Sequence, residues 1–589
     1  MADVVRPAEW PMPSHDVQDP VAHIGFCVVY NISGEPAACV NGGFTEQGAP
    51  WGCRSQPAAT PTAPHRPDYC ENLHHSPFPK GHPPMRTPHR HGLAAALAVA
   101  ALGLTACSAG SEDGADDAGP AQDASVSIGL AAVPANLDYT TSGGAAIFEA
   151  LLGNVYEGLV QLDEHGEVEP LLAESWEISE DGTEYSFTLR EDVTFHDGTP
   201  FDAEIVQFSL ERLDEWTANT PDNLAAIDQV EVDSPTEVTM VLSEPDYDAL
   251  YWLAGPLGTM FAPDSVDDLA SEANGTGPFT FESYENAVQM DLARHEDYWG
   301  EPAGVAEASL VYYEDAAAAA NALRTGGVDA ILRAEAYDQV ESFEEEDEFD
   351  VVIGDTQAVA VLAMSNDHEE LSDPEVREAI SLAIDKEAVL AAATTGHGTI
   401  LGGPSVPTDS YYQDYSEERP HDPEAAEELL EQAGVEDLSL RFTLPNRPYA
   451  EAIAQVVQDD LGEIGISVDL ETQEFPAVWV EQTMTNQDYD LTVVSHVEPR
   501  NMINYDDPDY YWGYDSEEAA EHFAEARAAT DDADYASAME AAADQVVQDA
   551  PGVWLYNSPN IVISRDGVEG LPEDDLGVGM NLSGISVDH

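Results

Sequence analysis

Several short patterns in the sequence begin like catalytic motifs, but none is complete. His295-Glu296 and His368-Glu369 start like the H-E-x-x-H helix of zinc proteases, yet each lacks the second histidine. Gly396-His397-Gly398 starts like a dinucleotide-binding fingerprint, but it follows a predicted helix instead of a strand. The sequence has no G-x-S-x-G elbow, no Walker loop and no C-x-x-C pair. We therefore expect a binding protein that is not an enzyme and needs no cofactor, with a secreted hydrolase of an unfamiliar type as the less favoured alternative.

Acidic residues dominate the composition. The chain has 589 residues, with 115 Asp plus Glu against 19 Lys plus Arg, which gives a net charge of −96. This charge argues against nucleic acid as a partner, because a phosphate backbone requires a basic surface. It also argues against docking on an anionic lipid surface. Because the acids are spread through every segment, we interpret them as a solvated surface adapted to salt, in preference to a store of cations.

Residues 85–107 read MRTPHRHGLAAALAVAALGLTAC and resemble a secretory signal. Two arginines precede the apolar run Leu93–Leu104, which is too short to span a bilayer as a helix. The residues that follow end in Cys107 and resemble a bacterial lipobox, in which the cysteine is acylated and becomes the new N-terminus. The sequence therefore predicts a lipid anchor at Cys107.

The position of this signal has consequences for the segments around it. A signal peptide stands at the start of a chain, so we expect translation to begin at Met85 and residues 1–84 to be a spurious upstream extension. A genuine disordered leader is the alternative. Residues 108–124 are small and acidic, and are expected to form a disordered tether. No cysteine follows Cys107, so no disulfide can stabilise the main body.

From Ser125 onward, predicted strands and helices alternate. Ser125–Leu130 is predicted to be a strand and Ala145–Glu157 a helix. Glu184–Arg190 alternates apolar and polar residues, as a half-buried strand does, and residues 230–242 are predicted to form a strand pair. Helices with a first-turn proline or a glycine just beyond their end are predicted at Ala316–Thr325, Pro374–Ile384, Pro423–Gln432 and Tyr449–Ile464. This order predicts an α/β protein with several strand clusters.

The order of local sequences resembles that of one family. Residues 155–204 read VYEGLVQLDEHGEVEPLLAESWEISEDGTEYSFTLREDVTFHDGTPFDAE, and the later matches are TGPFTFESYE (276–285), EDYWGEPA (296–303), VREAISLAIDKEAV (376–389), DPEAAEELLEQAG (422–434) and GEIGISVDL (462–470). Their order and spacing resemble the bacterial extracellular solute-binding proteins of family 5, which serve dipeptide, oligopeptide and nickel importers. The resemblance covers about residues 125–589.

The resemblance implies a two-lobed α/β fold, the type II periplasmic-binding-protein fold with an extra domain inserted in the first lobe. We expect the inserted domain at 164–275 and lobe II at 358–545. Lobe I is expected to combine 125–163, 276–357 and 546–589. The segments expected to cross between the lobes as a hinge are Val359–Asn366 and Gly552–Pro559. A solute bound between the lobes would stabilise their closure.

The resemblance also points to residues 489–512 as the recognition segment. A strand at Asp490–Val494 is predicted to end at the cleft, where peptide-binding relatives pair a strand edge with the ligand's main chain. Arg500, one of 13 basic residues from Cys107 onward, is expected to meet either a ligand carboxylate or an acid of the protein. The first candidates are Ser495, His496, Val497, Glu498 and Arg500. Candidates for side-chain pockets, although aromatic residues more often belong to the core, are Tyr411, Tyr412, Tyr510, Tyr511 and Trp512.

Peptide-binding relatives commonly hold the ligand's α-ammonium with an aspartate a few residues before a proline. Counting back from Pro508, that position is Asn504, which supplies no charge, and a buried ammonium without a counter-charge is costly. We therefore expect either that Glu498, Asp506 or Asp507 takes this role, with Glu498 favoured, or that the solute lacks a free amine there.

The resemblance to this family and to a lipobox together imply an extracytoplasmic substrate-binding component of an ABC importer, anchored by lipid to the outer face of the cytoplasmic membrane. The expected partners are an oligopeptide-like solute and the importer's permease and ATPase subunits, and the expected oligomeric state is a monomer. The same fold binding a metal chelate or an oligosaccharide is the alternative. No metal site is expected, because the sequence after Cys107 has no His/Cys cluster.

Overall fold

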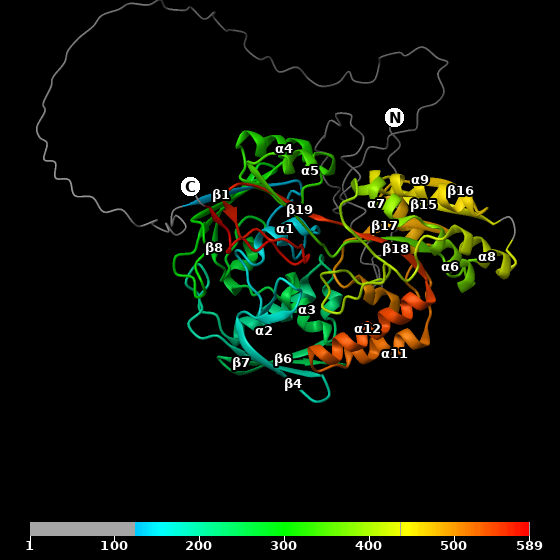
Figure 1. The fold of residues 1–589 in the computed structure, drawn as a ribbon. Coiled ribbons are helices and arrows are strands. Elements are labelled where there is room, and N and C mark those ends of the chain that lie inside the picture. Colours follow the sequence, from blue (N-terminus) through cyan, green and yellow to red (C-terminus); the bar gives the residue numbers. More distant parts are fainter. Residues whose placement is uncertain (1–123, 436–437, 588–589) are drawn as a thin grey trace, which may run out of the picture. The chain divides into compact units, whose positions relative to one another are not determined.

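The computed structural model describes residues 124–435 and 438–587. The signal peptide, Cys107 and almost all of the expected tether lie outside these residues. Within the described part of the chain, no helix is both long and apolar enough to cross a membrane. The described residues combine helices with three larger sheets and two small two-stranded ones (Figure 1).

A seven-stranded sheet collects strands from distant parts of the chain. β1 lies near its centre and pairs in parallel with β10 and β11, while the remaining pairs are antiparallel. The helices α4 (Ala316–Thr325) and α5 (Val340–Glu344) share a hydrophobic cluster with β19. In spatial order the strands are β12 (Phe349–Gly354), β19 (Asn560–Arg565), β11 (Ala330–Ile331), β1 (Ser125–Leu130), β10 (Glu307–Tyr312), β9 (Gln289–Arg294) and β8 (Phe279–Glu285).

A six-stranded sheet forms the second large unit of the fold. Every residue of its central strands β13 and β18 is buried, as expected for strands covered on both faces. Its strands in spatial order are β14 (Thr399–Ile400), β18 (Gly552–Asn557), β13 (Val359–Met364), β17 (Leu491–His496), β15 (Ser439–Pro445) and β16 (Ser467–Gln473). The helices that share its hydrophobic cluster are α6 (Pro374–Ala383), α7 (Lys386–Thr394), α8 (Pro423–Ala433) and α9 (Pro448–Glu463).

A four-stranded antiparallel sheet lies within residues 164–275. In β5 the side chains of Tyr185, Phe187 and Leu189 are buried and alternate with exposed ones, which confirms the predicted half-buried strand. The predicted strand pair at 230–242 is also confirmed, as β6 and β7. The order is β4 (Ala173–Ile178), β5 (Glu184–Leu189), β7 (Glu237–Leu242) and β6 (Ile227–Ser234), with the helices α2 (Ala203–Glu211) and α3 (Asp248–Ala254).

The remaining elements are short or lie outside these sheets. The helices α11 and α12 pack against each other, and they belong to the same hydrophobic cluster as the four-stranded sheet. These elements are α1 (Ala145–Leu151), α10 (Ala477–Trp479), α11 (Glu517–Arg527), α12 (Asp532–Asp549), and the small sheets β2 (Val160–Leu162) with β3 (Val168–Pro170) and β20 (Val568–Glu569) with β21 (Ser586–Val587).

Most predicted helix ends are confirmed by their capping residues. The Asp422 side chain accepts the Ala425 backbone N–H at the start of α8, and α4 ends at Gly326, whose φ of 72° is the left-handed conformation that glycine favours. The helix predicted at 145–157 is too long. α1 ends at Leu151, because the chain turns at Gly153 with φ 79°.

The chain passes between the seven-stranded and six-stranded sheets twice, at 355–358 and at 558–559. The segments expected to cross, Val359–Asn366 and Gly552–Pro559, are therefore mostly the strands β13 and β18 of one sheet, because strand pairing continues up to the crossings. The fully buried Asn557 side chain donates to the carbonyls of Thr356 at 2.7 Å and Ala358 at 2.8 Å. It also accepts the Thr356 N–H at 3.2 Å, so the two crossings are hydrogen-bonded to each other.

Residues 546–557 lie with the second unit of the fold. The lobe boundary expected at 545–546 falls inside α12, which runs unbroken to Asp549, and β18 then pairs within the six-stranded sheet. The change of sheet at 558–559 is the better place for this boundary. The division of the chain into lobes and an inserted domain remains a proposal.

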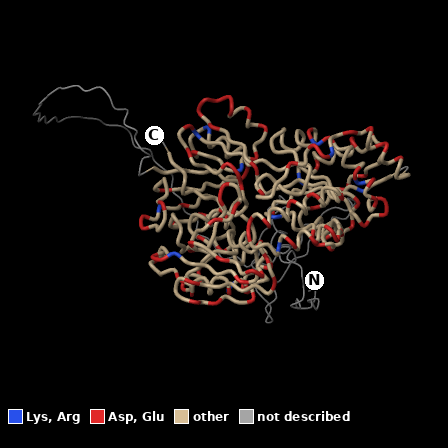
Figure 2. The backbone as a smooth tube through the Cα atoms, turned by 60° about the horizontal axis from the view of Figure 1, so that its bottom comes forward, with Lys and Arg blue, Asp and Glu red and all other residues tan. Residues whose placement is uncertain are grey.

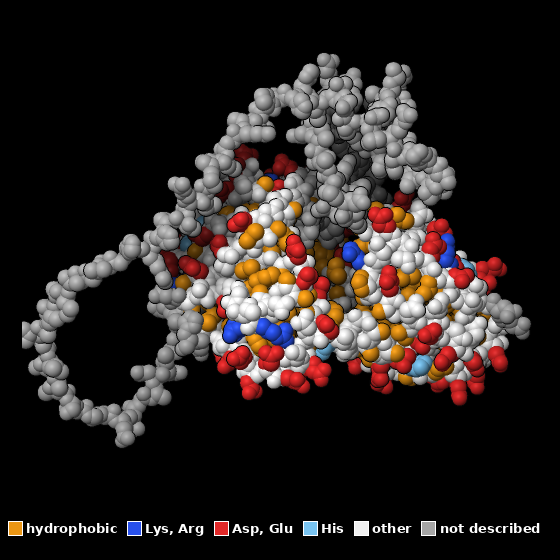
Figure 3. Space-filling view, turned by 90° about the horizontal axis from the view of Figure 1, so that it is seen from above, with side chains coloured by type: hydrophobic (Ala, Val, Ile, Leu, Met, Phe, Trp, Pro, Cys, Tyr) orange, Lys and Arg blue, Asp and Glu red, His pale blue; other side chains and the backbone are white. Residues whose placement is uncertain are grey.

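Acidic residues occur along all described parts of the backbone, while basic residues occur at a few scattered positions (Figure 2). The face seen in Figure 3 likewise shows acidic side chains distributed over its surface with few basic ones between them. The excess of acid in the sequence is thus a general property of the surface rather than one concentrated site.

Candidate functional site

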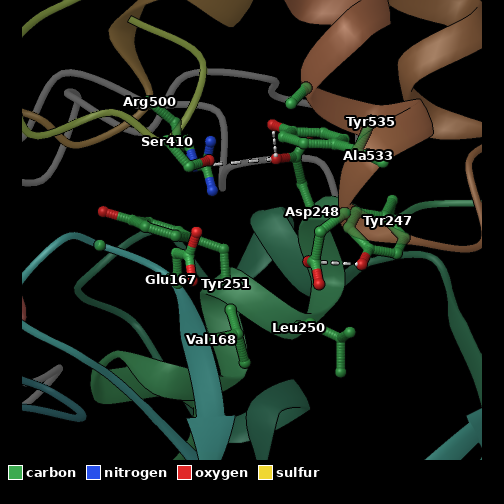
Figure 4. Close-up of a pocket in the computed structure, with 13 residues that line it drawn as sticks. Glu167, Val168, Tyr247, Asp248, Leu250, Tyr251, Ser410, Arg500, Ala533 and Tyr535 are labelled. Atoms are coloured by element: carbon green, nitrogen blue, oxygen red, sulfur yellow. Dashed lines mark hydrogen bonds and ion pairs between the residues drawn. The ribbon is translucent and has the colours of Figure 1, made fainter.

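A cavity of about 310 Å³ lies where five segments distant in the sequence meet (Figure 4). Its wall includes the β2–β3 hairpin with Glu167 and the residues around α3 from Tyr247 to Tyr251. The opposite wall includes Arg500, which follows β17, and the first turn of α12. The β2–β3 hairpin, α3, the segment after β17 and the start of α12 therefore enclose the space together.

Arg500 is brought to the cavity by an unusual backbone conformation. β17 ends at His496, and Arg500 then takes φ 58° and ψ 29° immediately before the 3₁₀ turn Asn501–Asp506. This left-handed conformation costs a non-glycine residue about 1–2 kcal/mol. The side chain it directs into the protein is only 7% exposed.

Aromatic rings surround the guanidinium of Arg500. Its central carbon lies 4.2 Å from the ring centre of Tyr251 and 5.2 Å from those of Tyr411 and Tyr535. Guanidinium groups are attracted to aromatic faces at such distances. The rings contact the faces of the guanidinium, so they position the cation without forming hydrogen bonds to its N–H groups.

The polar groups around Arg500 are only partly paired. Its Nε lies 3.9 Å from Oδ1 of Asp248, beyond hydrogen-bond distance, and that oxygen accepts the Tyr535 hydroxyl at 2.6 Å. Nε and Nη1 of Arg500 have no hydrogen-bond partner among the described residues, and neither do the buried hydroxyls of Tyr251 and Tyr411. Buried polar groups are normally paired, so this concentration of unpaired donors next to a cavity suits a polar ligand.

Two carboxyl groups near the cavity protonate close to neutral pH. Burial raises the pKa of Asp409 to about 6, although the charge of Arg500 acts in the opposite direction. Burial, and then the charge of Asp248, raise the pKa of Asp246 to about 7. The charge next to Arg500 therefore changes within the pH range in which a protein is ordinarily studied.

Of the first candidates from the sequence, Arg500 alone lines the cavity. Ser495 is half-buried at the end of β17, and its backbone N–H donates to the Tyr449 hydroxyl. His496 is buried and its Nε2 lies 3.0 Å from the Tyr511 hydroxyl, while Val497 is 63% exposed. Glu498 is exposed and lies 3.6 Å from Nδ1 of His496.

The other candidates lie around the cavity or in the core. Tyr411 is fully buried against Arg500, whereas Tyr412 is half-buried and Asn504 lies half-buried in the 3₁₀ turn, neither lining the cavity. Trp512 stacks on Tyr505 with ring centres 4.2 Å apart and belongs to the hydrophobic core.

Sequence reasoning missed Asp248, Tyr251 and Tyr535. The segment Tyr247-Asp248-Ala249-Leu250-Tyr251 carries a weak signal, because two tyrosines four residues apart share one helix face. Acid and tyrosine are frequent throughout this chain, so the spacing alone could not single out the segment. No group of three or more His, Cys, Asp or Glu side chains in the described part of the chain is arranged to hold a metal ion.

Residues 167–522 match the family described as bacterial extracellular solute-binding proteins, family 5. The chain belongs to this family. The match extends from the β2–β3 hairpin through α3 and β17 to α11, and so includes Arg500 and Asp248. The resemblance seen in the sequence is confirmed.

Relatives of known function in family 5 include peptide-binding proteins. The glutathione-binding protein GsiB of Salmonella paratyphi A is 28% identical over 334 residues, which cover 54% of this chain and 64% of that protein. The di/tripeptide-binding protein 1 of Pseudomonas aeruginosa is 29% identical over 383 residues, which cover 58% of this chain and 70% of that protein. The chain therefore spans slightly less than two thirds of the length of the glutathione-binding protein it matches.

Solved structures confirm the predicted periplasmic-binding-protein fold. The periplasmic binding protein DppA of Helicobacter pylori, in complex with the peptide STSA, has a TM-score of 0.65 at 23% identity, covering 79% of this chain and 98% of that one. The nickel ABC transporter protein of Bacillus halodurans has a TM-score of 0.69 at 26% identity, covering 79% of this chain and 100% of that one.

Proposed function

We propose that this family 5 protein is the extracytoplasmic substrate-binding component of an ABC importer and captures small peptide-like solutes in the cavity around Arg500. The single observation that carries the proposal is the cavity itself, whose wall combines the β2–β3 hairpin and α3 with Arg500, which follows β17 of the six-stranded sheet, and the start of α12. A solute that contacts both sides stabilises the closed arrangement, as hinge closure requires. The family description supports a binding role over an enzymatic one.

The size of the cavity favours a small solute. Ligand pockets have volumes of about 300–1,000 Å³, and this cavity of about 310 Å³ is at the lower end of that range. Among the relatives, one protein is named for glutathione, one for di- and tripeptides, and one structure contains the dipeptide Met-Leu. These names support a solute of about the size of a dipeptide or tripeptide.

A direct binding test uses three peptides with the purified protein: Met-Leu, Ser-Thr-Ser-Ala and glutathione. Saturation with a peptide at 100 times its Kd is expected to stabilise the fold by about 2.7 kcal/mol, visible as a rise in Tm and as heat in calorimetric titration. The nickel complex of L-histidine, which is bound in one relative, is the comparison probe for a metal chelate. Binding of the nickel complex without any peptide binding would favour the metal-chelate alternative and reject the peptide.

The lipid anchor and the location follow from the sequence signal at 85–107. We propose that Cys107 is acylated and holds the protein at the outer face of the cytoplasmic membrane, where it delivers solute to the permease and ATPase subunits as a monomer. Cys107→Ala is expected to release the protein into the medium or to leave it unprocessed. Intact-mass measurement on protein from the native host tests this, and a stable mature protein that retains residues 1–84 would contradict it.

We also propose that the acidic surface is an adaptation to salt. With a net charge of −96 on the full chain, self-repulsion destabilises the compact state when ions do not screen it. Raising salt from about 0.1 M to about 1 M shortens the screening length about threefold, so Tm is expected to rise over this range. A Tm that does not change with salt would contradict the proposal.

A further inference from the structure

Arg500 is the charged group that the segment after β17 directs into the cavity. None of the carboxylates of residues 497–512 lines this space. Glu498 is exposed beside His496, and Asp506 is 2.5 Å from Nη1 of Arg527. Asp507 and Asp509 are exposed as well. The acids expected to hold a ligand ammonium therefore do not line the cavity, whereas Arg500 of the same segment does.

The unpaired donors of Arg500 define what its ligand must offer. The guanidinium is buried, and its Nε and Nη1 have no hydrogen-bond partner among the described residues. Leaving two donors of a buried cation unpaired is unfavourable, so the site is incomplete as it stands. A carboxylate oxygen at either of these N–H groups would form a charge-assisted hydrogen bond, which is stronger than a neutral one.

The cavity also limits how many negative charges a ligand can carry. Glu167 and Asp248 line the same space as Arg500, and Asp248 faces the guanidinium (Figure 4). Asp532 lines it as well and accepts the Tyr247 hydroxyl. These carboxylates would repel further anionic groups placed near them. The arrangement therefore fits a single carboxylate beside Arg500 on an otherwise neutral or cationic solute.

We infer that Arg500 binds a carboxylate of the solute with its unpaired N–H groups. The inference rests on the proposed function and deepens it. Asp248, which already accepts the Tyr535 hydroxyl, serves as the nearby acid that the solute carboxylate must outcompete for Arg500.

Chemically blocked peptides test this inference on the unaltered protein. The probes are Met-Leu, Ser-Thr-Ser-Ala, and for each a C-terminal amide and an N-acetyl copy, titrated by calorimetry. Amidation removes the carboxylate and is expected to weaken binding about 30-fold or more, as loss of one partner of a buried charge pair does. Acetylation removes the ammonium and is expected to leave most of the affinity in place.

Variants of two arginines complete the test. Arg500→Gln and Arg500→Lys are expected to weaken binding of the unblocked peptide, the lysine variant less strongly because it keeps the positive charge. Arg377→Gln is the matched control, because Arg377 is equally buried but does not line the cavity. If Arg500→Gln fails to fold, the affinities of Arg500→Lys and of the blocked peptides for the unaltered protein test the inference in its place.

The outcomes separate this inference from the function on which it rests. If an amidated peptide binds as tightly as its parent, or if acetylation alone abolishes binding, Arg500 is not the carboxylate site while peptide capture stands. If neither parent peptide binds the protein, both the proposed function and the inference are rejected. Loss of affinity on amidation in the unaltered protein, but equal affinities in Arg500→Gln, supports the inference.

Discussion

Two arginines of this protein are equally buried but differ in how they are paired. Arg377 on α6 is 6% exposed, and Arg500 is 7% exposed. Arg377 donates four hydrogen bonds to backbone carbonyls, among them those of Asp549 and Ala550 at the end of α12. Arg500 makes ring contacts and one ion pair at 3.9 Å, and its Nε and Nη1 have no hydrogen-bond partner among the described residues.

This difference separates an arginine that stabilises the fold from an arginine that can bind a ligand. Arg377 caps the C-terminus of α12, where carbonyl groups lack helical partners and a positive charge is favourable, so its surroundings complete its bonding. The surroundings of Arg500 leave its bonding incomplete next to a cavity. Burial alone does not distinguish these roles, whereas hydrogen-bond pairing does.

The largest expected effect comes from changing each arginine to glutamine. Arg377→Gln is expected to lower the free energy of unfolding by about 3 kcal/mol or more, because several buried carbonyls lose their donors, and to leave solute affinity unchanged. Arg500→Gln is expected to lower the affinity for a carboxylate-bearing peptide by about 2–5 kcal/mol. Its effect on the free energy of unfolding is expected to be smaller than that of Arg377→Gln, because Nε and Nη1 of Arg500 have no hydrogen bonds to lose, although Asp248 loses its nearby cation.

Denaturant unfolding and calorimetric titration of both variants measure these two quantities separately. Equal losses of stability in the two variants, with equal affinities, would show that Arg500 is a structural residue like Arg377 and would remove the basis of the comparison.

The Asn557 side chain at the crossing between the sheets is a second buried polar group whose hydrogen bonds are paired, unlike those of Arg500. Asn557→Ala is expected to lower the free energy of unfolding by about 2–3 kcal/mol, because it leaves the buried carbonyls of Thr356 and Ala358 without their donor. Ser558→Ala, at the next residue, is the control and is expected to change stability little. Thermal unfolding checks the pair, and equal Tm values for both variants would mean that the crossings are held by other contacts.

The pH dependence of binding sharpens the account of the cavity. Asp409 faces Arg500, Asp248 and Tyr411, and burial raises its pKa to about 6. Protonation removes a negative charge that competes for Arg500, so affinity for a carboxylate-bearing peptide is expected to increase as the pH falls through about 6. In the unliganded protein, a raised carboxyl pKa means that the folded state binds the proton more tightly. The contribution of Asp409 to stability is therefore present at acid pH and is lost as the pH rises through about 6.

Asp409→Asn separates this effect from other titrations. The pKa of Asp246, raised to about 7, adds its own pH dependence, and the variant retains that background. Calorimetric titration across this range is expected to show a steeper change in affinity for the unaltered protein than for Asp409→Asn. Identical pH profiles would exclude Asp409 as a group that competes for Arg500.

The smallest expected effect concerns the contact that joins the two walls of the cavity. The Tyr247 hydroxyl donates to Oδ1 of Asp532 at 2.8 Å, which links the segment before α3 to α12. Tyr247→Phe is expected to weaken solute affinity by about 0.5–1.5 kcal/mol, the contribution of one hydrogen bond. Tyr415→Phe removes a similar bond to Asp544 away from the cavity and is the control. Equal affinities of the two variants would contradict a role for this contact in closure.

Local pattern was enough to predict much of the fold. β1 and α4 have the predicted bounds, and the alternation of β5 follows directly from its sequence. The end of α1 was not predictable by periodicity, because it depends on the turn at Gly153 and on the Asn154 side chain, which donates to the Met580 carbonyl and accepts the Leu582 N–H. Such contacts join positions more than 400 residues apart in the chain.

The candidate site was only partly accessible to sequence reasoning. Arg500 could be singled out because basic residues are scarce in this chain and because it follows a predicted strand of the recognition segment. Asp248 and Tyr535 could not, since they come from other elements and resemble many other acids and tyrosines. Glu498 was favoured for an ammonium, but the chain turns at Arg500 after leaving Glu498 exposed, and this turn is not visible in residue types.

Mass spectrometry of the solute released from protein purified from its own host tests the central claim most directly. The unaltered protein and Arg377→Gln are expected to carry the same small peptide-like solute with a free carboxylate, and Arg500→Gln is expected to carry none. The same solute in equal amounts from Arg500→Gln, or a solute without a carboxylate, would contradict the account.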